Sequence, residues 1–112
     1  MTYSPGALIV AIDAKLALRP RIRLDNLARE LQVERHSIEK LIRRVARVSF
    51  REYRNEKLLT RALALLREPG SLTVKQIAYI LDYRSPGAFT RFVKRATGLT
   101  PAQIRRQSAA GG

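Results

Sequence analysis

Apolar residues recur every three or four positions along most of the chain, which is the spacing that places side chains on one face of an α-helix. Leu8, Ile12 and Leu16 form the first such set. No useful length of sequence alternates β-branched or aromatic residues with polar ones, so the pattern contains no signal for a β-strand. We therefore predict an all-α fold of seven helices.

Residues that favour helix starts and stops mark the ends of these segments. Ser4 and Pro5 supply a cap and a first-turn proline, and Pro20 ends the first helix. Segments 49–52 and 73–76 have the sequence of a capping box, in which the first and fourth residues bind each other's backbone amides. The predicted helices span residues of about 5–18, 24–31, 35–46, 49–68, 73–81, 85–96 and 100–107.

The second half of the chain repeats the apolar pattern of the first half. The matched residues fifty positions apart are Leu27 with Ile77, Ala28 with Ala78 and Leu31 with Leu81. After one added residue, those 51 positions apart are Ile38 with Phe89, Leu41 with Phe92, Ile42 with Val93, Tyr53 with Ile104 and Arg54 with Arg105. The chain therefore contains two related helical units.

Basic residues follow the same repeat. The matched residues are Lys40 with Arg91, Arg43 with Lys94 and Arg44 with Arg95. At about 100° per residue, they lie opposite the apolar stripe of the predicted helices 35–46 and 85–96. Each of these helices is thus expected to have one buried face and one cationic face.

A short helix, a turn of about four residues and a second helix with an outward basic face is the plan of a helix-turn-helix unit, whose second helix enters the major groove of DNA. We predict one DNA-binding domain over 1–107 and a flexible tail over 108–112. Within the domain, the first unit with its leading helix spans 8–48, a long linker helix spans 49–68 and the second unit spans 73–107.

Charge supports a nucleic-acid partner. The 112 residues include 22 Lys and Arg against nine Asp and Glu, a formal net charge of +13. Such self-repulsion on a small body indicates an anionic partner, and nucleic acid is the commonest one. No acidic residue follows Asp82, whereas six basic residues do.

Other classes of protein are excluded by what the sequence lacks. There is no Cys and only one His, so disulfides, thiolate metal sites and Cys-His nucleophile pairs are excluded, and we expect no metal and no cofactor. No catalytic constellation is visible, so we expect no enzyme. The apolar stretch 7–12 is broken by Asp13 and has no basic segment before it, so it is neither a signal peptide nor a membrane span. We expect a cytoplasmic, nucleoid-associated protein.

Residues 77–101 closely resemble the signature of the AraC family of bacterial transcription regulators. The residues that carry the resemblance are Ile77-Ala78, Ser85-Pro86, Phe89, Arg91, Phe92, Lys94, Thr97-Gly98 and Thr100-Pro101. The first unit is similar to the family's first unit through Leu27-Ala28, Leu31, Ile38, Leu41, Ser49 to Tyr53 and Ala62. The match covers roughly residues 8–107.

The resemblance implies seven helices, two helix-turn-helix units joined by a long helix, and binding to promoter DNA that activates or represses transcription. The chain departs from the family mainly at glycines. Gln32 and Asp82 stand in the two turns where the family usually has Gly, and Arg47 replaces another Gly. Ile42 and Val93 stand where the family has a large aromatic residue.

The resemblance also implies the residues that contact DNA. Base contacts in the two reading helices are expected from His36, Glu39, Lys40, Arg43, Gly87, Ala88 and Arg91. Phosphate contacts are expected from Arg35, Arg44, Arg47, Thr73, Ser85, Thr90, Lys94, Arg95 and Arg105. Lys and Arg can donate to guanine and Glu can accept from cytosine, so we expect the first unit, with its polar reading face, to discriminate more strongly.

Two other readings remain open at this point. The same charge suits a basic protein that binds nucleic acid without reading bases, and the same fold suits a protein-interaction module. The expected partner is double-stranded DNA, with RNA polymerase as a further candidate, no membrane partner, and a monomeric state for these 112 residues. The sequence fits both a complete small regulator and a piece of a longer one.

Overall fold

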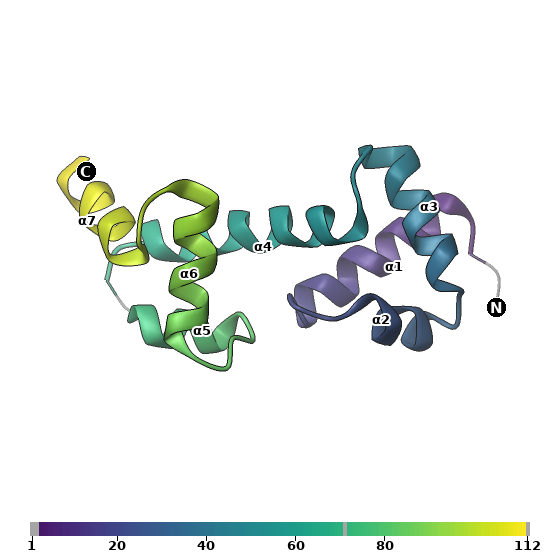
Figure 1. Ribbon diagram of the computed structural model, residues 1–112, viewed down its shortest axis with the longest axis horizontal. Helices are drawn as coiled ribbons and strands as arrows, with labels where there is room; N and C mark the ends of the chain where they lie inside the picture. The colour runs from purple at the N-terminus through teal and green to yellow at the C-terminus, as the bar shows by residue number, and fades with distance from the viewer. Residues whose placement is uncertain (1–2, 71, 112) are drawn as a thin grey trace. The chain divides into compact units, whose positions relative to one another are not determined.

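The computed structural model describes residues 3–70 and 72–111, and within them all regular structure is helical (Figure 1). The helices are α1 (Pro5–Leu18), α2 (Leu24–Leu31), α3 (Arg35–Ala46), α4 (Phe50–Arg67), α5 (Val74–Ile80), α6 (Pro86–Thr97) and α7 (Pro101–Gly111). The prediction of seven helices and no strand is confirmed for these residues. None of the helices described is both long and apolar enough to form a membrane span.

Side-chain caps explain where several helices begin. The hydroxyl of Ser4 accepts a hydrogen bond from the amide of Ala7 at 3.1 Å. Thr73 and Gln76 form both halves of a capping box, and Thr100 and Gln103 do the same ahead of α7. These bonds satisfy amides that have no acceptor within the helix, which is why the start signals in the sequence located the helices well.

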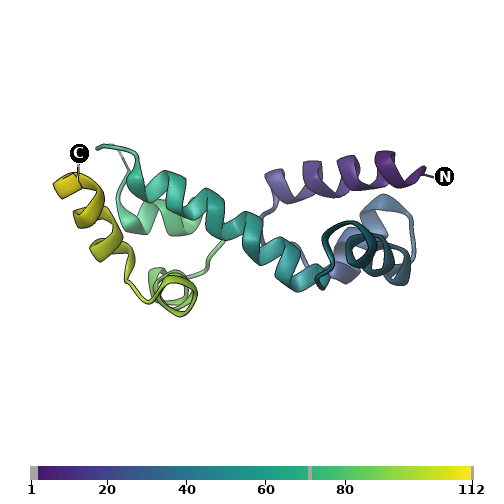
Figure 2. The same cartoon turned by 90° about the horizontal axis from the view of Figure 1, so that it is seen from above.

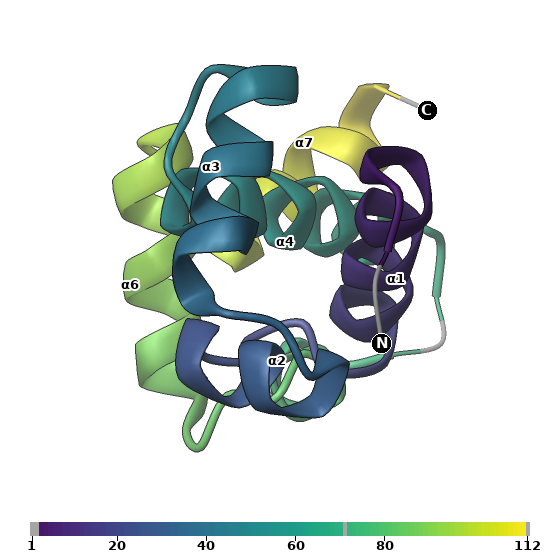
Figure 3. The same cartoon turned by 90° about the vertical axis from the view of Figure 1, so that its right-hand side faces the viewer.

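The chain divides into two compact units, residues 1–57 and 58–112. The boundary falls inside α4, so the segment predicted as a separate linker helix contributes residues to the core of each unit. In unit 1, α1, α2 and α3 pack against one another, as Figure 3 shows. Their buried side chains enclose one core with the first residue of α4: Leu8, Ile12, Leu16, Ile22, Leu27, Ala28, Leu31, Ile38, Leu41, Ile42 and Phe50.

Unit 2 has a core of its own. In it, α6 packs against α5 and α7, which appear in green and yellow in Figure 2. The buried side chains are Leu58, Ala62, Leu66, Ile77, Ala78, Leu81, Tyr83, Phe89, Val93 and Ile104. The ring of Tyr83 lies 5.4 Å from that of Phe89 and 6.0 Å from that of Phe92, centroid to centroid, a spacing at which tilted aromatic pairs attract each other.

Polar contacts tie the helices of unit 1 together around its core. The hydroxyl of Tyr53 on α4 donates to Asp13 on α1 at 2.6 Å. Burial, and then this bond to a carboxylate, raise the pKa of Tyr53 well above its ordinary value. Glu30 on α2 pairs with Lys15 at 3.1 Å and also with Arg19, and the bond from Lys15 lowers the pKa of Glu30.

Within residues 3–70 and 72–111, three non-glycine residues have left-handed backbones at the turns. Gln32 ends α2 at φ 57°, Arg47 ends α3 at φ 61°, and Asp82 lies in the second turn at φ 69°. These are the positions where the chain departs from the glycines of the AraC pattern. The turns keep the left-handed geometry without glycine, at the steric cost that a Cβ imposes there.

The end of the chain differs from the expectation. We predicted a flexible tail over 108–112, but α7 continues to Gly111. The hydroxyl of Ser108 donates to the carbonyl of Arg67 at 3.2 Å, and Ala109 and Ala110 have the highest helix propensity of any residue type. Helix α5 ends at Ile80, one residue before the predicted end.

Replacing Gln32 by Gly should stabilise unit 1 by about 0.5–1 kcal/mol, because the left-handed cost of a Cβ exceeds the extra backbone entropy of Gly in the unfolded chain. Gln32 is exposed, so no side-chain contact is lost. Urea denaturation followed by circular dichroism measures the change. Gln32→Ala keeps the Cβ and is the control. Equal stability of the Gly and Ala variants would contradict the explanation.

Candidate nucleic-acid interface

Helix α3 is held in a fixed rotation by its apolar stripe. Ile38 and Ile42 are fully buried in unit 1, and Leu41 is buried beside them. The opposite face presents the expected base-contact side chains to solvent, and all four are exposed: His36, Glu39, Lys40 and Arg43. Because these residues occupy one face of a regular helix, the structure brings them together as the sequence predicted.

Helix α6 repeats this arrangement in unit 2. Phe89 and Val93 are fully buried, while Gly87 and Arg91 are exposed and Ala88 is half-buried. An added Cβ at Gly87 would lie 3.4 Å from Nη1 of Arg91, so the guanidinium lies over the first turn of the helix where no side chain competes. Arg91 is therefore the main polar group on this reading face.

Most of the expected phosphate contacts also lie on the surface. The exposed ones are Arg35, Arg44, Arg47, Thr73, Ser85, Lys94 and Arg95, and Thr90 is half-buried. The hydroxyls of Thr73 and Ser85 accept bonds from amides at the starts of α5 and α6, which leaves each hydroxyl proton available to a phosphate oxygen. Arg35 forms an exposed ion pair with Asp25 at 2.7 Å.

Arg105, which was expected to contact phosphate, is engaged within its own unit. It is half-buried, and its guanidinium donates to three backbone carbonyls of unit 2: Leu66 at 3.2 Å, Leu65 at 3.4 Å, and Leu72. These bonds satisfy the end of α4 and the segment before α5, because the last carbonyls of a helix have no intrahelical donor. Arg105 therefore has a structural role within unit 2, and the phosphate contact expected of it stays a prediction.

The first unit uses the corresponding arginine in the same way, which the sequence analysis did not foresee. Arg54 donates to the carbonyl of Ile22 at 3.3 Å. Arg54 and Arg105 are 51 positions apart, and their acceptors Ile22 and Leu72 are fifty apart, so both bonds follow the repeat. In each unit an arginine thus fixes the segment that leads into the first helix of the helix-turn-helix.

No group of three or more His, Asp or Glu side chains suited to a metal occurs among the residues that the structure describes. The exposed surface of the two reading helices is dominated instead by cations. Its chemistry is hydrogen-bond donation to anionic or electronegative groups.

A family model described as a helix-turn-helix domain matches residues 27–107. This range begins inside α2, contains α3 to α6 whole, and covers the sequence repeat from Leu27 to Arg105. None of the curated proteins compared with the chain matches it significantly.

Solved structures share the fold over nearly the whole chain. A transcriptional regulator with an AraC-type DNA-binding domain from Chromobacterium violaceum is 25% identical, with a TM-score of 0.73 and 91% of both chains covered. The DNA-binding domain of AdpA, a global transcriptional factor solved with a target DNA, is 23% identical with a TM-score of 0.77, covering 96% of both chains. A DNA-binding transcriptional dual regulator from Escherichia coli K-12 is 22% identical with a TM-score of 0.74, covering 98% of this chain and 96% of that one.

Arg105→Ala should lower the free energy of unfolding of unit 2 by at least about 1.5 kcal/mol, since even one bond from a charged donor contributes about 1.5–3 kcal/mol. Arg106→Ala is the matched control, because Arg106 is its exposed neighbour and the charge change is equal. Thermal denaturation compares the two variants. A stable Arg105→Ala variant whose DNA binding depends less steeply on salt would instead support a phosphate contact.

Proposed function

The chain belongs to the AraC-type family of helix-turn-helix DNA-binding domains, and on this basis we propose that it binds specific sites on double-stranded DNA through α3 and α6 to regulate transcription. The observation that carries the proposal is the pair of cationic helix faces, each lying opposite a fully buried apolar stripe. A helix of about 10–12 Å diameter fits the major groove, which is about 12 Å wide. With the helix in the groove, its cationic face lies against the edges of the bases.

In unit 1, α3 offers both donors and an acceptor. Lys40 and Arg43 suit the O6 and N7 acceptors of guanine, and Glu39 suits the amino group of cytosine. His36, at the start of the same face, can donate or accept. Each well-formed contact provides about 1–3 kcal/mol of discrimination between bases.

In unit 2, α6 offers fewer polar groups. Arg91 suits guanine, and the methyl group of Ala88 suits the methyl group of thymine. Gly87 allows close approach of the backbone but supplies no side chain. Unit 1 is therefore the stronger reader, and unit 2 mainly positions the protein on the duplex.

The length of α4 supports binding of both units to one duplex. A helix of 18 residues spans about 27 Å, which is of the order of one turn of B-DNA at about 34 Å. The two reading helices then enter successive major grooves. Contacts to phosphate come from Arg35, Arg44, Arg47, Thr73, Ser85, Thr90, Lys94 and Arg95.

Selection of binding sites from random duplexes should enrich one sequence with two contacted segments. Lys40→Ala should relax the base preference in one segment and weaken binding to the selected site by about 1–3 kcal/mol. Arg91→Ala should relax the other segment less. Lys75→Ala, which removes an exposed lysine outside the reading faces, is the control for charge alone.

Failure to enrich any sequence, with tight binding to every duplex, would contradict specific recognition and indicate a general basic protein. Loss of more base preference in Arg91→Ala than in Lys40→Ala would reverse the proposed order of the two units. Absence of DNA binding at low salt would leave the fold as a protein-interaction module.

A further inference from the structure

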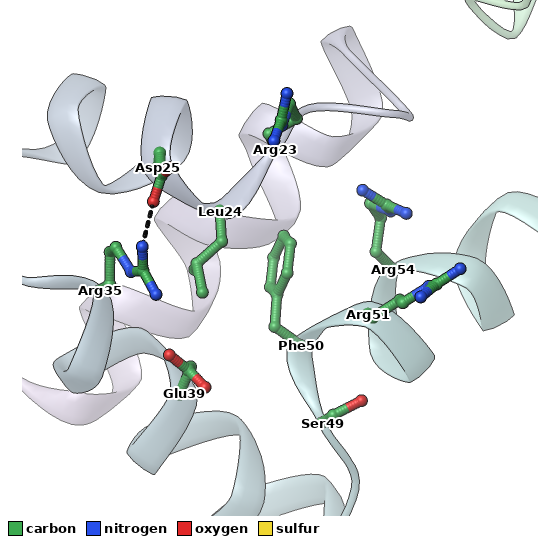
Figure 4. Close-up of a pocket in the computed structure, with 9 residues that line it drawn as sticks. All are labelled: Arg23, Leu24, Asp25, Arg35, Glu39, Ser49, Phe50, Arg51 and Arg54. Carbon is green, nitrogen blue, oxygen red and sulfur yellow. Dashed lines mark hydrogen bonds and ion pairs between the residues drawn. The ribbon is translucent and has the colours of Figure 1, made fainter.

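Unit 1 contains a cleft of about 500 Å³ beside the reading helix. Figure 4 shows Leu24 and Phe50 near its centre, with arginine side chains around them. The residues that line it come from the starts of α2, α3 and α4 and from the second turns of α3 and α4: Arg23, Leu24, Asp25, Arg35, Glu39, Ser49, Phe50, Arg51 and Arg54. Of these lining residues, only Arg35 and Glu39 were predicted from the sequence to contact DNA.

The arginines occupy unfavourable positions for helix stability. Arg23 is the N-cap of α2, Arg35 is the first residue of α3, and Arg51 is the second residue of α4. The N-terminus of a helix carries a partial positive charge, so a cation there is destabilising. Neither α2 nor α3 has a side-chain cap, so amides at these ends keep no side-chain acceptor. Positively charged side chains at the starts of three helices thus line one cleft.

The acidic residues in the cleft do not neutralise it. Asp25 is paired with Arg35 at 2.7 Å, and Glu39 is the other acidic residue in the lining. Arg54 is engaged with the carbonyl of Ile22. Arg23 and Arg51 form no ion pair within the part of the chain that the structure describes. Four arginines against two carboxylates leave the cleft cationic.

The centre of the cleft is apolar, because Phe50 is buried at its base and Leu24 is half-buried beside it. A ligand that suits this surface has an anionic group for the arginines and a compact apolar body for the centre. A phosphodiester with its attached deoxyribose has both. We propose that this cleft seats one sugar–phosphate step of the DNA strand that borders α3, with Arg23 and Arg51 as its phosphate contacts.

The position of Glu39 favours DNA over an unrelated anion. Glu39 lines the cleft and also belongs to the reading face of α3. Because a helix nearly fills the width of the major groove, residues on its flank lie next to the strand at the groove edge. The inference therefore rests on the proposed function and adds a binding site to it.

The two unpaired arginines of the cleft occur in unit 1 and are not repeated in unit 2. By the repeat, Thr73 corresponds to Arg23 and Ala102 corresponds to Arg51. The arginine with the structural bond is kept in both units, whereas the two unpaired arginines are not. This difference separates a role in folding from a role in binding.

The first test is the salt dependence of binding to the selected duplex. Arg51→Ala should bind roughly tenfold more weakly, since it loses a bond between two charged groups. The slope of log affinity against log salt should fall by about 0.9, the value for one phosphate contact. Stability should be unchanged or higher, because a cation leaves the start of α4. Base preference should not change.

A duplex with single methylphosphonate substitutions then locates the phosphate. At the phosphate that occupies the cleft, this neutral group should weaken DNA binding by the wild-type protein roughly tenfold. It should leave DNA binding by Arg51→Ala unchanged, which is the coupling expected of a direct contact. Arg29→Ala is the matched control, because Arg29 is exposed on α2 outside the cleft lining. It should remain as sensitive to that substitution as the wild type.

An Arg51→Ala variant with unchanged affinity and salt slope would overturn the inference, as would a methylphosphonate profile identical to that of the wild type. If either result is found while site selection still enriches one sequence, the proposed function stands and only the proposed role of the cleft is disproved. If no site is enriched, the proposed function fails. The salt slope on an arbitrary duplex then decides the cleft separately, because a phosphate contact does not depend on sequence.

Discussion

Burial of an apolar stripe on each reading helix is the constraint on which the rest of the molecule depends. Ile38 and Ile42 on α3, and Phe89 and Val93 on α6, are completely buried. A one-residue change in rotation would turn a helix by about 100° and expose these side chains. The packing therefore fixes which side chains face outward, and the charge on that face becomes a stable property of the fold.

The basic residues have different roles in different parts of the structure. Lys40 and Arg91 lie on exposed faces, whereas Arg54 and Arg105 bind backbone carbonyls within their own units. Asp13 and Glu30 are engaged with groups on other helices of unit 1. With the few acids engaged in this way, much of the net charge of +13 remains available to a polyanion.

The helices and reading faces could be predicted because their signals are local. Caps such as Thr73 and the spacing of Ile38 and Ile42 act within a few residues. The role of Arg105 could not be predicted, because its acceptors are more than thirty residues away and become neighbours only in the folded unit. The cleft likewise depends on Arg23 and Arg51, which lie far apart in the sequence, lining the same cavity in the folded unit. The left-handed backbone at Gln32 could not be predicted either, because the sequence has no glycine there to signal such a turn.

The two separate cores have a consequence for how long the protein stays on DNA. Since each unit buries its own apolar residues, one can open or detach while the other keeps its structure. A detached unit remains tethered through α4, so its local concentration near the duplex stays high and recapture becomes an intramolecular event. In the proposed complex, in which both units bind one duplex, dissociation requires both units to be released at the same time, so two individually weak interactions suffice for a long residence time.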